Sequence, residues 1–200
     1  MFRGEHMRKS LAALLAVALL GCASQPQPTA GDSVIVFILP GMTSLSGAYQ
    51  PSYGATPSVS LHDVSGPQRK MVGILGIGQK LAYRVSPGRH DFMLQNKGST
   101  DFLEANVAAG KTYYVVLQRT DDGYDQKYGF RPVRSSDFEN GLFARWETNL
   151  SYVERRDAWE RWSKANNASI ESRSRSHRLA WEKLGPEERG LKTLRVSDGR

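Results

Sequence analysis

Short apolar or alternating runs recur between positions 33 and 134, and turn-forming residues bound them. The first run, at 34–39, reads Val-Ile-Val-Phe-Ile-Leu and ends at Pro40 and Gly41, as expected of a central strand. Further strands are predicted at 59–64, 71–75, 80–85, 90–94, 102–107, 112–117 and 127–133. The 112–117 run is the richest in β-branched and aromatic residues, which favour strands.

Turn signals separate these runs at intervals of roughly ten residues. Pro87 with Gly88 forms one such turn, and Ala109 with Gly110 forms another. No helical period intervenes, so no crossover helix is expected. The seven or eight short strands therefore predict a mainly β protein, with a small antiparallel β-sandwich at residues 33–134.

After about Ser135 the pattern becomes helical, glycine becomes scarce and charge becomes dense. We expect an α-helical C-terminal extension at 135–200, with a stop at Gly185 and a restart at Pro186. The pattern leaves open whether the helix continues through 166–167. Two apolar helical faces are predicted, one with Tyr152, Trp159 and Trp162, the other with Ile170, His177, Trp181 and Leu184.

The tryptophan-bearing tail has two interpretations. Its stripe of Trp159, Trp162 and Trp181 covers a sheet face, with the arginines pointing into solvent, or it lies on a membrane interface. The first interpretation is favoured because amphipathic helices of globular proteins usually bury their apolar face against the core. The same three residues remain candidates for a partner surface.

The first residues of the chain have the layout of a secretory signal. Arg8 and Lys9 precede an apolar stretch at 11–20, which is too short to span a bilayer stably because spanning requires about 20 residues. Met7 is an alternative start. We therefore assign residues 1–21 to an export signal.

The signal ends in Leu19-Leu20-Gly21-Cys22, which resembles the lipobox of bacterial lipoproteins. The resemblance implies a diacylglyceryl thioether on Cys22, cleavage between Gly21 and Cys22, and usually N-acylation, for example with palmitate. The alternative is an ordinary signal peptide with a chance cysteine. Cys22 is the one cysteine of the chain and stands where a lipobox requires it, which favours the lipoprotein interpretation.

Residues 22–32 are small, polar and proline-rich, and so form the lipidated cysteine and a flexible tether. Ala23 follows the cysteine, where an aspartate resembles an inner-membrane retention signal. We therefore expect an anchor in the outer membrane, with the protein facing the periplasm of the bacterial envelope.

The chain carries a net charge of +7. Removal of the signal leaves about +5 by formal count, which suits anionic lipid, acidic polysaccharide or an acidic protein. Nucleic acid is not expected as a partner, because an exported lipoprotein does not share its compartment.

Two short segments, each at the start of a predicted strand, resemble sequences of a known family. They are Val-Ser-Pro-Gly-Arg-His at 85–90 and Val-Ala-Ala-Gly-Lys-Thr-Tyr-Tyr-Val at 107–115. They are similar to paired signatures of PEGA-like lipoprotein domains of unknown function in proteobacteria. The resemblance covers roughly 33–134 and implies a small immunoglobulin-like β-sandwich in the envelope. It implies no catalytic mechanism.

The sequence offers little catalytic chemistry. His62 and His90 could meet across strands to hold a metal, but no cysteine is available to them and no HExxH spacing exists, so no metal, cofactor or catalytic residue is predicted. G-x-S-x-G and S-x-x-K are also absent. The loop carrying Tyr49 and Tyr53 is a candidate partner surface, because loops often carry binding residues.

Three functional hypotheses follow. The first is a non-enzymatic binding or assembly module with a protein or glycan partner, held at the envelope by Cys22. The second is an envelope hydrolase with an unrecognised site, which a cleft joining Asp or Glu to His62 or His90 would favour. The third is a peripheral membrane-binding protein that uses its tail as a second anchor.

The lipid anchor yields the first testable prediction. Cys22→Ser should abolish both lipid attachment and signal cleavage, because only the thiol can form the thioether. Metabolic labelling with a fatty-acid analogue measures the outcome. Since the chain has no second cysteine, a variant that still incorporates label would contradict the lipoprotein interpretation.

Overall fold

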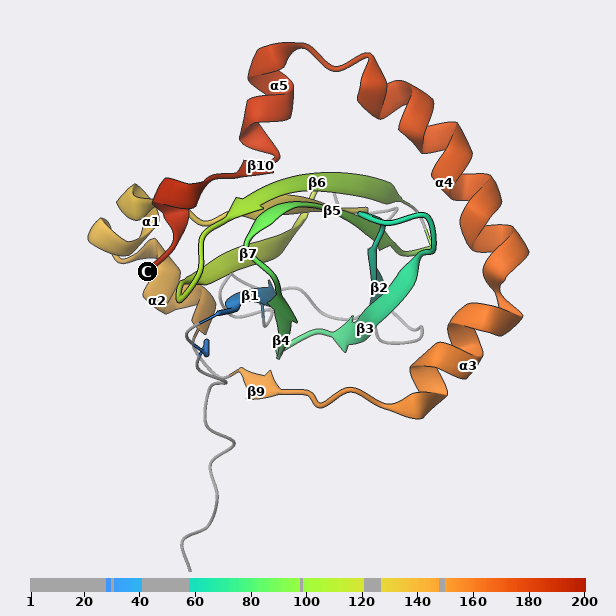
Figure 1. The fold of residues 1–200 in the computed structure, drawn as a ribbon, viewed down its shortest axis with the longest axis horizontal. Helices are drawn as coiled ribbons and strands as arrows, with labels where there is room; N and C mark the ends of the chain where they lie inside the picture. The colour runs from blue at the N-terminus through green and yellow to red at the C-terminus, as the bar shows by residue number, and fades with distance from the viewer. Residues whose placement is uncertain (1–27, 30, 41–57, 98, 121–126, 148–149) are drawn as a thin grey trace, which may run out of the picture.

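The structure is a computed structural model that describes residues 28–29, 31–40, 58–97, 99–120, 127–147 and 150–200. These residues form a mainly β body with two mixed sheets and several C-terminal helices (Figure 1). The predicted signal, Gly21 and Cys22, and the loop residues Tyr49 and Tyr53 lie outside the described residues.

Eight strands form the body, and each ends within two residues of its predicted bounds. They are β1 (Ser33–Leu39), β2 (Ser58–Asp63), β3 (Lys70–Gly76), β4 (Gln79–Val85), β5 (Gly88–Gln95), β6 (Thr100–Val107), β7 (Thr112–Arg119) and β8 (Tyr128–Pro132). The agreement follows from strong strand patterning and from turns that require glycine, since Gly88 and Gly110 have φ of 124° and 73°.

The tail contains the predicted helices and adds two short strands. The elements are α1 (Ser135–Glu139), α2 (Leu142–Glu147), β9 (Ser151–Tyr152), α3 (Asp157–Ala165), α4 (Asn167–Glu182), α5 (Pro186–Leu191), β10 (Thr193–Leu194) and a 3₁₀ turn, η2 (Val196–Asp198). The helical pattern thus breaks at Asn166, and the predicted restart at Pro186 is confirmed.

Two assignments within the tail were wrong. Tyr152 lies in β9, where it pairs with Lys80, and so does not share a helical face with Trp159. His177 is exposed. The reason is that α4 meets the sheet through Ile170 and Trp181, whereas the side chain of Arg178 covers the Phe102 ring at 4.0 Å.

The sheets are mixed rather than antiparallel, which corrects the expected arrangement. Their strand orders are β8-β7-β1-β4-β9 and β10-β6-β5-β2-β3. The pairs β1–β7, β4–β9 and β6–β10 are parallel. Parallel neighbours need long connections, and these pairs have them because β1 and β7 are joined through the other sheet, while β9 and β10 come from the distant tail.

The main core contains the inward side chains of both sheets. Phe37 of β1 meets Phe92 of β5 edge-on at 5.4 Å and Phe130 of β8 at 6.2 Å. Leu61, Leu94 and the other inward residues are fully buried around them. Such close-packed aromatic and aliphatic contacts hold the two sheets together.

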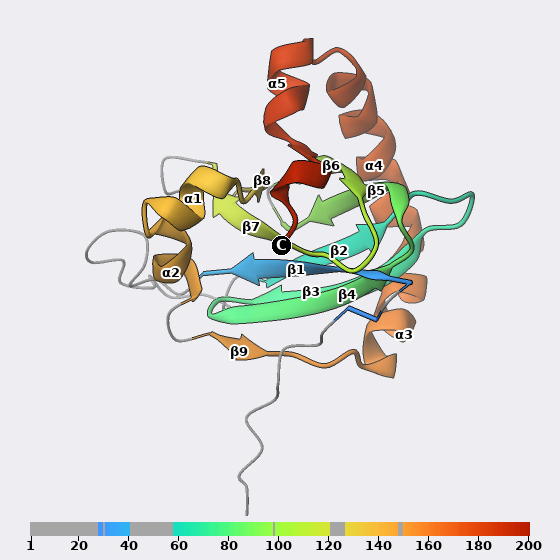
Figure 2. The same ribbon diagram turned by 60° about the vertical axis from the view of Figure 1, so that its left-hand side comes forward.

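Each sheet also buries part of its outer face, because helices of the tail pack against it (Figure 2). On one side Val36 and its neighbours in β1 pack against Phe143 of α2. On the other side Met93 and Phe102 pack against Ile170 and Trp181 of α4. Coverage on both faces explains why all seven residues of β1 are buried, and why that strand is a continuous apolar run.

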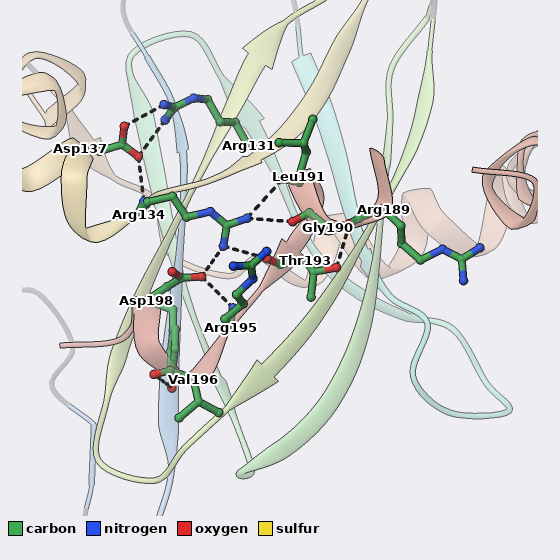
Figure 3. Close-up of polar contacts among 11 residues, drawn as sticks. Arg131, Arg134, Asp137, Arg189, Gly190, Leu191, Thr193, Arg195, Val196 and Asp198 are labelled. Carbon is green, nitrogen blue, oxygen red and sulfur yellow. Dashed lines mark hydrogen bonds and ion pairs between the residues drawn. The ribbon is translucent and has the colours of Figure 1, made fainter. Parts of the chain in front are cut away.

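The end of the chain is fastened to the body by a cluster centred on Arg134 (Figure 3). The Arg134 guanidinium pairs with the Asp198 carboxylate and donates to the carbonyls of Thr193 and Gly190 at 2.9 and 3.1 Å. The backbone of Arg200 exchanges two hydrogen bonds with Thr112 of β7. The described residues of 135–200 therefore pack as part of the same body as those of 33–134.

Tyr113 explains the structural role of the segment at 107–115, the second of the two that resemble PEGA-like domains. Its ring is fully buried in the main core, and its hydroxyl accepts a 2.8 Å hydrogen bond from the Ala108 N–H across the turn at Gly110. A Cβ on Gly199 would lie 2.5 Å from the Tyr113 ring. Tyr113 therefore links the turn at Gly110, the main core and the C-terminal residues of the chain.

The contrast between two tail tryptophans gives the second prediction. Trp181 is 6 % exposed and packs on Phe102 with ring centroids 6.0 Å apart, whereas Trp162 is 37 % exposed. Trp181→Ala should lower the free energy of unfolding by about 3–5 kcal/mol, and Trp162→Ala by less than about 1 kcal/mol. Urea denaturation measures both. Equal losses would contradict the assigned packing.

Candidate binding groove

A groove of about 480 Å³ lies between the second sheet and the two long tail helices. Its floor comes from β2, β3 and the end of β5, and its rim from α3 and α4. Figure 1 shows both helices running along this side of the body. The lining consists of Ser58, Ser60, Ile74, Gln95, Asn96, Lys97, Trp162, Ser169 and Arg173.

The position of α3 depends on two tryptophans three residues apart. Trp159 packs inward against the main core, while Trp162 lies at the groove and remains partly exposed. Gly73 of β3 makes room for Trp159, because a Cβ there would lie 2.8 Å from the indole ring and 2.5 Å from Leu81. The glycine thus allows α3 to approach the sheet closely.

Arg69, between β2 and β3, joins the sheet to both helices. Its side chain is 11 % exposed. Its guanidinium donates to Ser163 Oγ of α3 at 2.7 Å, to Asn167 Oδ1 of α4 at 2.5 Å and to Glu171 Oε1 of α4 at 3.2 Å. These hydrogen bonds fix the spacing of the helices that form the groove.

The same guanidinium determines the tautomer of His62 on β2. Arg69 Nη1 can only donate, so His62 Nδ1, 2.9 Å away, accepts, and the ring proton is on Nε2. Nε2 then donates to Ser60 Oγ at 3.2 Å, and Ser60 Oγ donates to the Gln95 carbonyl at 3.1 Å. A directed chain of hydrogen bonds therefore runs from Arg69 to the groove floor.

His62 is held neutral by its surroundings. Burial, followed by the positive charges of Arg69 and Arg173, lowers the His62 pKa from 6.5 to about 3. A second proton on the ring would also place a donor against the Arg69 donor. At neutral pH the groove floor is therefore an uncharged polar network.

Two groove residues have polar atoms that nothing in the described part of the chain satisfies. Gln95 is 1 % exposed, and its Nε2 donates to the Ile170 carbonyl at 3.0 Å, yet its Oε1 has no partner there. Arg173 donates from Nη1 to the Asn96 carbonyl at 2.8 Å, but its Nε likewise has no partner. Unpaired buried polar atoms are costly, and other described residues away from the groove, such as Thr100 and Tyr152, also have them.

The charge of the groove has one sign. Arg173 and Lys97 line it, and no carboxylate occurs among the lining residues that the structure describes. The groove therefore combines a partly exposed indole, hydroxyl and amide groups, and two cations. Such an arrangement can bind a polar anionic ligand.

Ser60 and His62 are close, but their hydrogen bonds are the reverse of those in a nucleophilic pair. An activated serine donates its proton to a histidine whose other nitrogen is oriented by a carboxylate. Here the histidine donates to Ser60, and a guanidinium faces its other nitrogen. A pKa of about 3 also makes His62 a weak base.

The two histidines considered for a metal do not come together. His62 is opposite Met93 in the β2–β5 register, and His90 Nε2 contacts the Ser86 carbonyl at 2.8 Å. Across the described ranges, no group of three or more His, Cys, Asp or Glu residues could hold a metal ion.

Of the candidate partner-surface residues, the structure places Trp162 at the groove, Trp159 against the main core and Trp181 under α4. Arg69, Gln95 and Arg173 were missed by sequence reasoning. No local pattern marks them, since their sequence separations are large and the pairing of β2 with β5 brings them together.

No family model matches the chain, and no curated protein matches it. In the part of the chain that the structure describes, no helix has the length and apolar character needed to cross a membrane.

The His62 environment yields a prediction of pH dependence. A folded-state pKa below the unfolded value means that stability is full above pH 6.5 and falls as the pH drops from about 6.5 toward 3. The slope attributable to His62 should approach about 1.4 kcal/mol per pH unit. His62→Gln, which keeps one acceptor and one donor but does not titrate, should flatten this part of the profile.

Urea unfolding measured from pH 7 to pH 4 checks this, with His177→Gln as the control because His177 is exposed. The control should retain the acid sensitivity of the parent chain. Identical slopes in the parent and in His62→Gln would contradict the assignment.

Proposed function

We propose that this protein is a non-enzymatic binding module of the bacterial envelope. In this proposal Cys22 carries the lipid, residues 22–32 form the tether, and a PEGA-like, immunoglobulin-like β-sandwich with its helical tail presents the groove to the periplasm. The anchor is in the outer membrane, because Ala23 rather than aspartate follows the cysteine.

The observation that carries the proposal is the groove itself. It joins a partly exposed tryptophan, two cations and unsatisfied buried polar atoms of Gln95 and Arg173 in one depression. Binding sites typically combine an aromatic surface with a few convergent polar groups. The groove is also preorganised, since Arg69 and Gly73 fix the helices on the sheet.

Binding is preferred to hydrolysis because of the direction of the hydrogen bonds. Ser60, at the groove floor, accepts a hydrogen bond from His62 and donates its own to the Gln95 backbone carbonyl. A hydrolase built on this pair would need a basic His62, whereas burial and two arginines disfavour its protonation.

A membrane-binding tail is the second candidate, supported by the exposed Leu179 and Leu191, which are 63 % and 69 % accessible. Two of the three tryptophans that would enter the membrane are packed instead: Trp181 is 6 % exposed and Trp159 contacts the core. The packing therefore favours the groove over the tail as the functional surface.

Site-specific photocrosslinking in intact cells tests the proposal. A photoreactive amino acid at Lys97, which is exposed at the groove, should yield a discrete crosslinked species. The same amino acid at Leu191, away from the groove, is the matched control. The species should disappear in the Cys22→Ser background, because the partner is reached only from the membrane.

Crosslinks to lipid at Leu191 and Leu179, with none at Lys97, would contradict the binding-module proposal and support a membrane-binding protein. A crosslink at Lys97 that is unaffected by Cys22→Ser would contradict the anchoring part of the proposal.

A further inference from the structure

The lining of the groove restricts the chemistry of what it can bind. Trp162 is a large aromatic residue of the groove that is partly open to solvent, at 37 % exposure, and it is carried on a helix fixed by Arg69 and Trp159. A fixed indole face offers a flat, apolar, electron-rich surface. The C–H face of a pyranose ring, which is apolar and carries partial positive charge, is complementary to it.

The remaining floor suits a ligand with many hydroxyls. Ser58 and Ser169 have exposed hydroxyl groups in the lining, and the buried Ser60, Gln95 and Asn96 form a polar floor behind them. Among the described lining residues, Ile74 is the one large apolar side chain besides Trp162. A peptide recognised by its side chains would need deeper apolar pockets, whereas sugar hydroxyls match hydroxyl and amide partners.

The two cations of the groove favour a ligand that carries negative charge. Arg173 is half-buried and oriented by its hydrogen bond to the Asn96 carbonyl, with Nε unpaired among the described residues. Lys97 lies beside Asn96 in the sequence and lines the same groove. A ligand carboxylate would complement these two cations, and the described residues of the lining include no carboxylate.

We infer that the groove binds an acidic oligosaccharide, with a sugar ring stacked on Trp162 and its carboxylate held by Arg173 and Lys97. This inference rests on the proposed binding function and specifies its ligand class. The volume of about 480 Å³ lies within the range of roughly 300–1,000 Å³ that is usual for small-molecule sites.

Isothermal titration calorimetry on the lipidated full chain in detergent micelles tests the inference. The probe is an α-1,4-linked hexamer of galacturonic acid, and the comparators are its methyl ester and hexaglutamate. The acid should bind, and the methyl ester should bind at least about tenfold more weakly. Hexaglutamate should not bind, because it has charge but no sugar face.

Variants then locate the interaction. Trp162→Ala, Arg173→Gln and Lys97→Gln should each weaken binding of the hexamer by about tenfold or more, whereas Trp162→Phe should retain most of the affinity. Lys164→Gln removes an exposed cation of α3 that does not line this groove, and it should leave the affinity unchanged. The exposed Lys97 variant keeps the test valid if Arg173→Gln fails to fold.

Equal affinity for the acid and its methyl ester would overturn the requirement for charge, and binding of hexaglutamate would replace the saccharide by an acidic peptide. Failure of both saccharides, with a groove crosslink still formed in cells, would overturn the ligand class but leave the binding function in place. If neither saccharide binds and no groove crosslink forms in cells, both the proposed binding function and the inferred ligand class are overturned.

Discussion

The guanidinium of Arg69 is the interaction on which the candidate site depends. It is nearly buried and contacts β2 through His62, α3 through Ser163 and α4 through Asn167 and Glu171. A buried cation requires several well-placed acceptors, because its loss of hydration is otherwise uncompensated. That requirement fixes the two helices relative to the sheet, keeps His62 neutral and sets the direction of the hydrogen bonds below the groove.

The tail has a structural role as well as a functional one. The outer faces of the two sheets carry apolar residues such as Val36 and Phe102, which need a packed layer to shield them from water. Aromatic residues of the tail provide it, with Phe143 on one sheet and Trp181 on the other. Trp146 and Trp181 meet this demand, whereas Trp159 packs against the main core and Trp162 lies at the groove, where it stays partly exposed.

On strand β2, the tail helices pack over a polar face of the sheet and make it part of the groove. Val59 and Leu61 point into the main core, and Ser60 and His62 alternate with them on the opposite face. In a two-layer protein that face would be solvated. Here α3 and α4 lie over it, so both side chains are buried: His62 pairs with Arg69 and with Ser60, and Ser60 lies at the floor of the groove.

The sequence by itself determined the strands, the main turns, the helical character of the tail and the break before Pro186, because these depend on local periodicity and on residues such as Gly88 and Gly110. Tertiary structure alone decided that β1 pairs in parallel with β7, and that β9 and β10 of the tail each extend one edge of a sheet. It also decided that His177 is exposed while Trp181 is buried. It also brought together Arg69, Gln95 and Arg173. The physical reason is that strand pairing and helix docking depend on which distant faces bury the most apolar surface together, and local spacing does not encode that choice.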